Sequence, residues 1–131
     1  MIKYITNNNR YMKHANRTIF FLSKVVADVV VKEDGYVKLY MSGDGNYIKV
    51  KGCSASDVNG SRVHTANGAS FFSACELLTY IDSSDKIYAY GTDTHGGVIL
   101  RLHETQSKPK NFKVLKKEPK MFMANSGFDA N

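Results

Sequence analysis

Cysteine is scarce in this chain, which has only Cys53 and Cys75 among its 131 residues. Two cysteines this far apart are too few for a zinc framework, and a disulfide-based scaffold normally has more. Cys75 lies on the apolar side of a predicted helix, where a thiol usually packs as a small hydrophobic group. The sequence therefore predicts no metal site and a reducing location, the cytoplasm.

Long hydrophobic runs are also missing. The longest, residues 18–31, is interrupted by Lys24 and Asp28 and is too short to span a bilayer. Residues 1–17 are polar and basic and lack the apolar core of a signal peptide. The glycine-rich stretches SGDG and HGG do not have the spacing of a phosphate-binding loop. We therefore expect no membrane partner, no secretion and no cofactor.

Positive charge is what the chain has in excess, with a formal net charge of +6. The hydrophobic content of 43% and charged content of 23% are typical of a globular protein, and the length predicts a single domain over residues 1–131. The domain is expected to have a basic N-terminal arm, residues 1–17, and a lysine-rich C-terminal segment, residues 106–131. A basic protein of this size favours an anionic partner, either nucleic acid or an acidic protein surface.

Apolar residues alternate along several segments, as in half-buried strands. Residues 18–32 are rich in Ile, Phe and Val and predict one long strand or two short ones. A loop with Gly35 in the left-handed conformation would pair this strand with residues 36–41. A two-residue Gly43-Asp44 turn would then pair Leu39 with Ile48 and Val37 with Val50. Residues 86–91 and 98–103 predict two more strands, and residues 111–117 are a candidate edge strand.

Helical spacing occurs once, in residues 70–81, with apolar residues at Phe71, Ala74, Cys75 and Leu78 and with Ser70 as a candidate N-cap. These four side chains are expected to pack against Val29, Val37, Leu39, Ile48 and Val50. The predicted fold class is α+β: an antiparallel sheet of about five hairpin-connected strands with one helix on its apolar face.

The outward face of this sheet is the best functional clue. In the register given above, Lys38 and Lys49 lie directly opposite each other, and like charges opposite each other repel. The same face is expected to carry Lys32, Tyr36, Tyr40, Tyr47 and Lys51. Lysines that meet phosphates beside flat rings that stack on unpaired bases are typical of nucleic-acid-binding sheets. Solvated strand faces are also often rich in Tyr and Lys, and another segment of the chain can cover such a face.

Two further groups of residues are candidates for anion binding. The C-terminal segment is rich in lysine, including Lys113, Lys116 and Lys117, and reads either as a basic arm along a phosphate backbone or as a solvated tail. Arg62 and His64 precede the predicted helix, and a helix N-terminus attracts negative charge.

The loop GTDTHGG, residues 91–97, has the pair of residues closest to a catalytic unit, Asp93 and His95. A His–Asp pair can act in acid–base catalysis or form half of a metal site. Gly, Asp and Thr are also the usual residues of a hairpin connection. We therefore expect His95→Ala to leave both fold and function largely intact.

Three functions remain open from the sequence. The first is a non-enzymatic RNA- or single-stranded-DNA-binding protein. The second is a protein-binding accessory or inhibitor protein, of the kind that phages produce, whose basic face meets an acidic partner. The third is a small hydrolase or nuclease that uses Asp93 and His95. No Ser-His-Asp or Cys-His constellation favours an enzyme.

Overall fold

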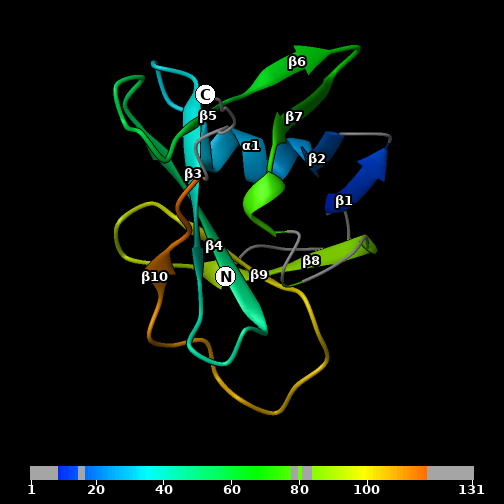
Figure 1. Ribbon diagram of the computed structural model, residues 1–131, viewed down its shortest axis with the longest axis vertical. Coiled ribbons are helices and arrows are strands. Elements are labelled where there is room, and N and C mark those ends of the chain that lie inside the picture. The colour runs from blue at the N-terminus through cyan, green and yellow to red at the C-terminus, as the bar shows by residue number, and fades with distance from the viewer. Residues whose placement is uncertain (1–8, 15–16, 78–79, 81–83, 118–131) are drawn as a thin grey trace, which may run out of the picture.

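In the computed structural model, the described part of the chain forms ten short strands and one α-helix (Figure 1). The structure describes residues 9–14, 17–77, 80 and 84–117. Every strand pairing in this part of the chain is antiparallel. The elements are β1 (Asn9–His14), β2 (Arg17–Leu22), α1 (Lys24–Val30), β3 (Tyr36–Met41), β4 (Tyr47–Cys53), β5 (Ser61–Arg62), β6 (His64–Ala66), β7 (Ala69–Ser73), a 3₁₀ turn η1 (Cys75–Leu77), β8 (Ser84–Thr92), β9 (Val98–Arg101) and β10 (Lys113–Val114).

The strand order is β10-β3-β4-β9-β8-β1-β2-β7-β6, and β5 also pairs with β3, at Tyr36 and Val37. Figure 1 shows β3 and β4 on one side of α1 and β2 on the other, and α1 contacts β2, β4, β7 and β9. The α+β class is therefore confirmed, but the predicted number of about five strands is too low. Residues 9–14 form β1 between β8 and β2, so this part of the expected N-terminal arm belongs to the sheet.

The helix is in a different place from the one predicted. Residues 17–22 form a strand as expected, but Ser23 then caps a helix, because its Oγ accepts a hydrogen bond of 3.3 Å from the backbone N–H of Val26. Val26, Ala27 and Val30 are buried on the inner side of α1. β-Branched residues have only modest helix propensity, so packing inside the curled sheet, and not local preference, determines this helix. The predicted pairing of residues 27–31 with β3 is therefore wrong.

The described part of residues 70–81 does not form the predicted helix, because Ala69–Ser73 form β7 and Cys75–Leu77 form a 3₁₀ turn. Asn67 and Gly68 both have positive φ, 53° and 79°, as a type I′ turn requires, and this turn joins β6 to β7. Phe72 pairs with Phe20 on β2, and their rings stack with centroids 5.5 Å apart. Phe72 is therefore buried in place of Phe71, and Ser70 is a strand residue. Leu78, expected in the helix, lies outside the described residues.

The β3–β4 hairpin forms with a register two residues from the predicted one. Leu39 pairs with Val50 and Met41 with Ile48, because the loop has four residues, 43–46. Asp44 stabilises this longer loop, since its carboxylate accepts hydrogen bonds from the backbone N–H of Asn46 and from the hydroxyl of Ser42. A shift of two residues preserves the faces. The predicted core residues Val37, Leu39, Ile48 and Val50 are all fully buried.

Three strand predictions in the C-terminal half of the chain are confirmed. The strands at residues 86–91 and 98–103 correspond to β8 and β9, and the candidate edge strand corresponds to β10, which pairs with β3. Gly35 has the expected left-handed conformation, with φ of 72°. No helix in the described ranges is long and apolar enough to cross a membrane.

Candidate functional site

The outer face of β3 and β4 carries five of the ten side chains predicted to bind nucleic acid. Tyr36, Lys38, Tyr40, Lys49 and Lys51 are on this face, and all are partly exposed. In the observed register Lys38 is opposite Lys51, and Lys49 is opposite Tyr40. The predicted Lys38–Lys49 pair is therefore wrong, although two lysines still lie opposite each other.

Tyr47 is not an exposed ring. Only 1% of it is accessible, its hydroxyl donates a hydrogen bond of 2.7 Å to the carbonyl of Ser107, and its ring lies edge-on to Tyr90. Burial raises the pKa of Tyr47. The prediction that Tyr47 offers a surface for base stacking is wrong, because the segment around Ser107 returns over this end of the sheet.

Lys38 is neutralised by the chain itself. Its Nζ lies 2.8 Å from Oδ2 of Asp57, in the loop after β4, and about four-fifths of each side chain is buried. The hydrogen bond to Asp57 raises the pKa of Lys38 against the opposing effect of burial, and the same bond lowers the pKa of Asp57. Both groups are therefore charged at neutral pH, and their charges cancel.

Lys49 is enclosed on several sides. Its Nζ lies 3.0 Å from Oδ2 of Asp93 and 4.9 Å from the ring centroids of both Tyr40 and Phe112. A cation over two aromatic faces and beside a carboxylate is a stable internal arrangement. Phe112 belongs to the C-terminal segment, so that segment covers part of the predicted binding face.

The remaining positive charge of this face is small. Lys32 and Lys51 have no ion pair with any carboxylate that the structure describes. Lys32 follows α1 and lies beside Gly52, where its Cγ would be 3.1 Å from an added Cβ. The repulsion expected from the sequence is thus relieved by Asp57 and Asp93, without an external anion.

Asp93 and His95 do not form an acid–base pair. One carboxylate oxygen of Asp93 accepts hydrogen bonds from the backbone N–H groups of His95 and Gly97, and the other faces Lys49. Burial acts to raise the pKa of Asp93, but the hydrogen bonds from Gly97, Lys49 and His95 outweigh it and lower the pKa to about 2. Nδ1 of the exposed His95 ring lies 3.3 Å from the hydroxyl oxygen of Thr94. The geometry is that of a hairpin connection, and the described ranges contain no cluster of three or more His, Cys, Asp or Glu residues able to hold a metal.

Arg62 and His64 lie on β5 and β6, and both are exposed. The His64 ring packs beside Phe71, with centroids 5.7 Å apart. Because residues 69–73 form a strand, the helix N-terminus expected beside Arg62 and His64 does not exist. The structural basis of the predicted anion pocket is therefore wrong.

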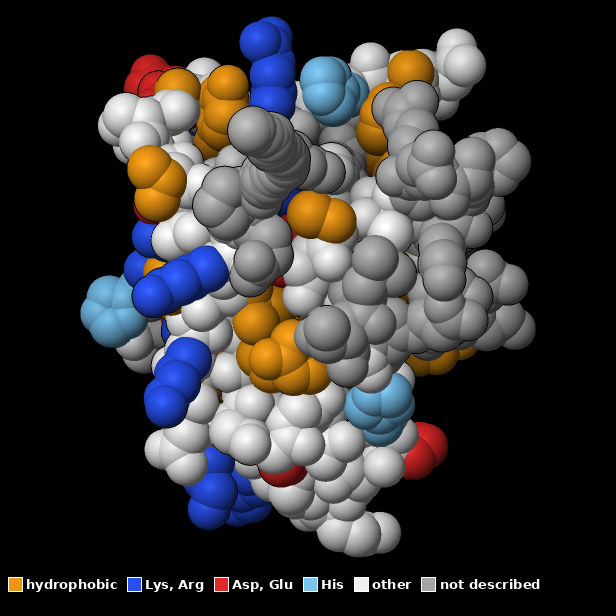
Figure 2. Space-filling view, viewed as in Figure 1, with side chains coloured by type: hydrophobic (Ala, Val, Ile, Leu, Met, Phe, Trp, Pro, Cys, Tyr) orange, Lys and Arg blue, Asp and Glu red, His pale blue; other side chains and the backbone are white. Residues whose placement is uncertain are grey.

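The exposed positive charge is instead concentrated on the C-terminal segment. Four side chains, those of Lys108, Lys110, Lys113 and Lys116, are exposed and form no ion pair with a described carboxylate. We call these four residues the lysine edge. Figure 2 shows Lys and Arg side chains along the side of the molecule that carries β10 in Figure 1.

Backbone contacts hold the lysine edge in place. The N–H of Gly43 donates to the carbonyl of Lys110, and the N–H of Leu115 donates to the carbonyl of Leu39 at 2.7 Å. Lys117 differs from the four, because its ammonium group lies 3.1 Å from the carboxylate of Glu76, which is only 2% exposed. Lys117 therefore anchors the segment and contributes little free charge.

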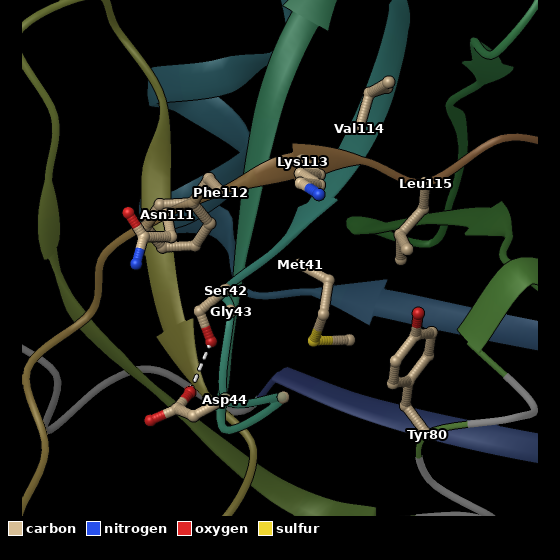
Figure 3. A pocket seen from close by; sticks show the side chains of 11 residues that line it. Met41, Ser42, Gly43, Asp44, Tyr80, Asn111, Phe112, Lys113, Val114 and Leu115 are labelled. Carbon is tan, nitrogen blue, oxygen red and sulfur yellow. Dashed lines mark hydrogen bonds between the residues drawn. The ribbon is translucent and has the colours of Figure 1, made fainter.

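A groove of about 930 Å³ opens beside the lysine edge (Figure 3). Met41, Leu115 and the ring of Tyr80 form its apolar part, while Ser42, Asp44 and Lys113 lie at its rim. Sequence reasoning missed this groove, because Tyr80 was assigned to a helix and the partners of residues 111–115 were unknown. The one available signal was the apolar pair Val114-Leu115 between Lys113 and Lys116.

No family model, no curated protein and no solved structure matches the chain.

Proposed function

We propose that this chain is a non-enzymatic binding protein for RNA or single-stranded DNA and that the lysine edge holds the phosphate backbone. The observation that carries the proposal is that four exposed lysines, none paired with a described carboxylate, lie within nine residues of a segment fixed to the sheet. Lysine–phosphate contacts release counterions and supply most sequence-independent affinity for nucleic acids.

The arrangement of the four lysines supports a linear polyanion as the ligand. Residues 108–116 span at most ~30 Å when extended, which is enough to follow several phosphates. The pairing of β10 with β3 fixes Lys113 along the edge of the sheet. The major groove of a duplex usually takes an α-helix or a β-ribbon. The described α-helix packs against β2, β4, β7 and β9 and is not available to enter a duplex groove. The row of exposed lysines along an extended segment suits the backbone of a single strand.

The test compares two double variants that remove the same charge. Lys110→Gln/Lys113→Gln removes two members of the lysine edge. Lys32→Gln/Lys51→Gln removes the two sheet-face lysines that have no ion pair. Fluorescence anisotropy with a labelled oligo-dC 12-mer, measured at several salt concentrations, gives the affinity and its salt dependence.

We expect the slope of log K against log[salt] to fall by about 0.7 for each lysine lost from the edge, and to change little in the control variant. Absence of binding by the parent protein at low salt would overturn the proposal. Equal losses in the two variants would also overturn it, because net charge alone would then explain the binding.

An acidic protein surface is the alternative partner. Its supporting observation is that β10 ends the strand order, so the lysine edge lies at a sheet edge able to meet another chain. Binding to an acidic protein fraction together with no affinity for the oligonucleotide would favour this partner.

A further inference from the structure

The groove beside the lysine edge combines a positive charge with an apolar surface. Lys113 pairs with Met41 across β10 and β3, and paired residues point to the same face of a sheet. Leu115, two residues further on, also points to this face. An ammonium group therefore lies above an apolar surface, where the core of the molecule reaches the sheet edge.

The ring of Tyr80 forms the side wall of this surface. Tyr80 is 43% exposed, whereas Met41 and Leu115 are 5% and 8% exposed. Figure 3 shows the ring standing beside Met41, with its hydroxyl directed toward Leu115. A flat ring exposed in a groove next to free lysines is the arrangement on which unpaired bases stack. The groove volume of about 930 Å³ lies within the usual range of ligand sites.

Asp44 distinguishes between a base and a phosphate as the occupant. Hydrogen bonds from Ser107, Asn46 and Ser42 hold the pKa of this carboxyl group well below its usual range. Asp44 is therefore negatively charged at neutral pH, and it disfavours a phosphate inside the groove. A base carries no charge, and the amino groups of cytosine, adenine and guanine can donate hydrogen bonds to a carboxylate.

We propose that the groove takes one unpaired nucleobase of the strand held by the lysine edge, stacked on Tyr80 over Met41 and Leu115, while the adjoining phosphate lies on Lys113. This inference rests on the proposed function, since it assigns a base-binding site to the same ligand.

The test separates the base from the backbone. An oligo-dC 12-mer and an abasic 12-mer have the same phosphates, but only the first has rings to stack. Tyr80→Ala is expected to weaken binding of the oligo-dC 12-mer by about 5- to 150-fold, the range that corresponds to loss of one stacked base. Binding of the abasic strand is expected to stay unchanged.

Tyr88 provides the matched control. It is 44% exposed on β8, almost the same fraction as Tyr80, and it does not line the groove. Tyr88→Ala is expected to bind both oligonucleotides like the parent protein. A loss as large as that of Tyr80→Ala would overturn the assignment of the groove.

The chain contains no tryptophan, so Tyr80→Trp introduces a single indole as a direct probe. This variant keeps an aromatic wall, and its fluorescence is expected to be quenched by the oligo-dC 12-mer but not by the abasic strand. Tyr88→Trp is expected to show no quenching.

The two proposals fail in different ways. Lysine-dependent binding of both oligonucleotides, with no effect of Tyr80→Ala and no quenching in Tyr80→Trp, would overturn the base site and leave the proposed function standing. Absence of binding to either oligonucleotide would overturn both.

Discussion

The outer face of β3 and β4 and the lysine edge are both rich in lysine, yet their charges differ in what they are free to do. On the sheet face, Lys38 and Lys49 lie 2.8 Å and 3.0 Å from carboxylate oxygens and are largely buried. On the edge, Lys108, Lys110 and Lys113 are exposed and have no described carboxylate partner. Whether a lysine is free to bind an anion therefore depends on which loops fold back over its strand. The number of lysines on a strand does not show how many of them are free.

The largest effect on stability is expected from Asp93→Ala. This change removes the partner of Lys49 and the acceptor for two backbone N–H groups, those of His95 and Gly97. Breaking a largely buried pair from one side leaves an uncompensated charge. We expect the free energy of unfolding to fall by about 2–3 kcal/mol in urea titrations. A loss below about 0.5 kcal/mol, the range of ordinary surface changes, would show that the loop does not neutralise Lys49.

The pH dependence of stability tests the same pair. The pKa of Asp93 is lowered from 3.8 to about 2 in the folded protein. Its contribution is therefore complete above pH 4 and is lost as the pH falls toward 2. The parent protein is expected to lose about 2 kcal/mol of its stability advantage over Asp93→Asn between pH 6 and pH 2. A constant difference between the two urea midpoints would contradict a charged, paired Asp93.

A smaller effect is expected on the other half of the sheet face. Lys38→Met keeps the aliphatic stem and removes only the ammonium group that binds Asp57. Asp57 keeps its hydrogen bond from the backbone N–H of Asn59, so we expect a loss of about 1 kcal/mol in thermal or urea unfolding. A more stable variant would indicate that the Lys38–Lys51 repulsion exceeds the attraction of the ion pair.

The smallest effect on stability is expected on the lysine edge. Lys113→Gln removes an exposed charge without an ion pair, so the free energy of unfolding should change by less than about 0.5 kcal/mol. Oligonucleotide affinity should nevertheless fall, and the salt slope should decrease by about 0.7. A destabilised variant with unchanged affinity would show that Lys113 serves the fold and not ligand binding, contrary to the difference proposed between the two regions.

The strands β3 and β4 were predictable, because each carries its alternating pattern locally. The helix was not, since Val26 and Val30 suit a strand and become helical only through the Ser23 cap and the surrounding sheet. The residues Phe71 to Leu77 show the opposite error, because the Asn67-Gly68 turn and the partner strand β2 override their helical spacing.

The lysines of the sheet face and of the C-terminal segment were identified from the sequence, but which of them are neutralised by a carboxylate was not. Asp57 is 19 residues from Lys38 in the chain, and Asp93 comes from a loop between two other strands. No local pattern links these carboxylates to the lysines they neutralise. Tyr80 could not be recognised as a groove residue either. Met41 lies on β3 and Leu115 follows β10, and both are distant from Tyr80 in the sequence.

Acylation of lysine side chains, read residue by residue by mass spectrometry with and without the oligo-dC 12-mer, tests the comparison most directly. It reports on both regions of the unmodified protein in one experiment. We predict fast acylation of Lys108, Lys110, Lys113 and Lys116 that the oligonucleotide suppresses, and slow acylation of Lys38 and Lys49 in either condition. Protection of Lys38 and Lys49 by the oligonucleotide, with no change at the lysine edge, would contradict the account.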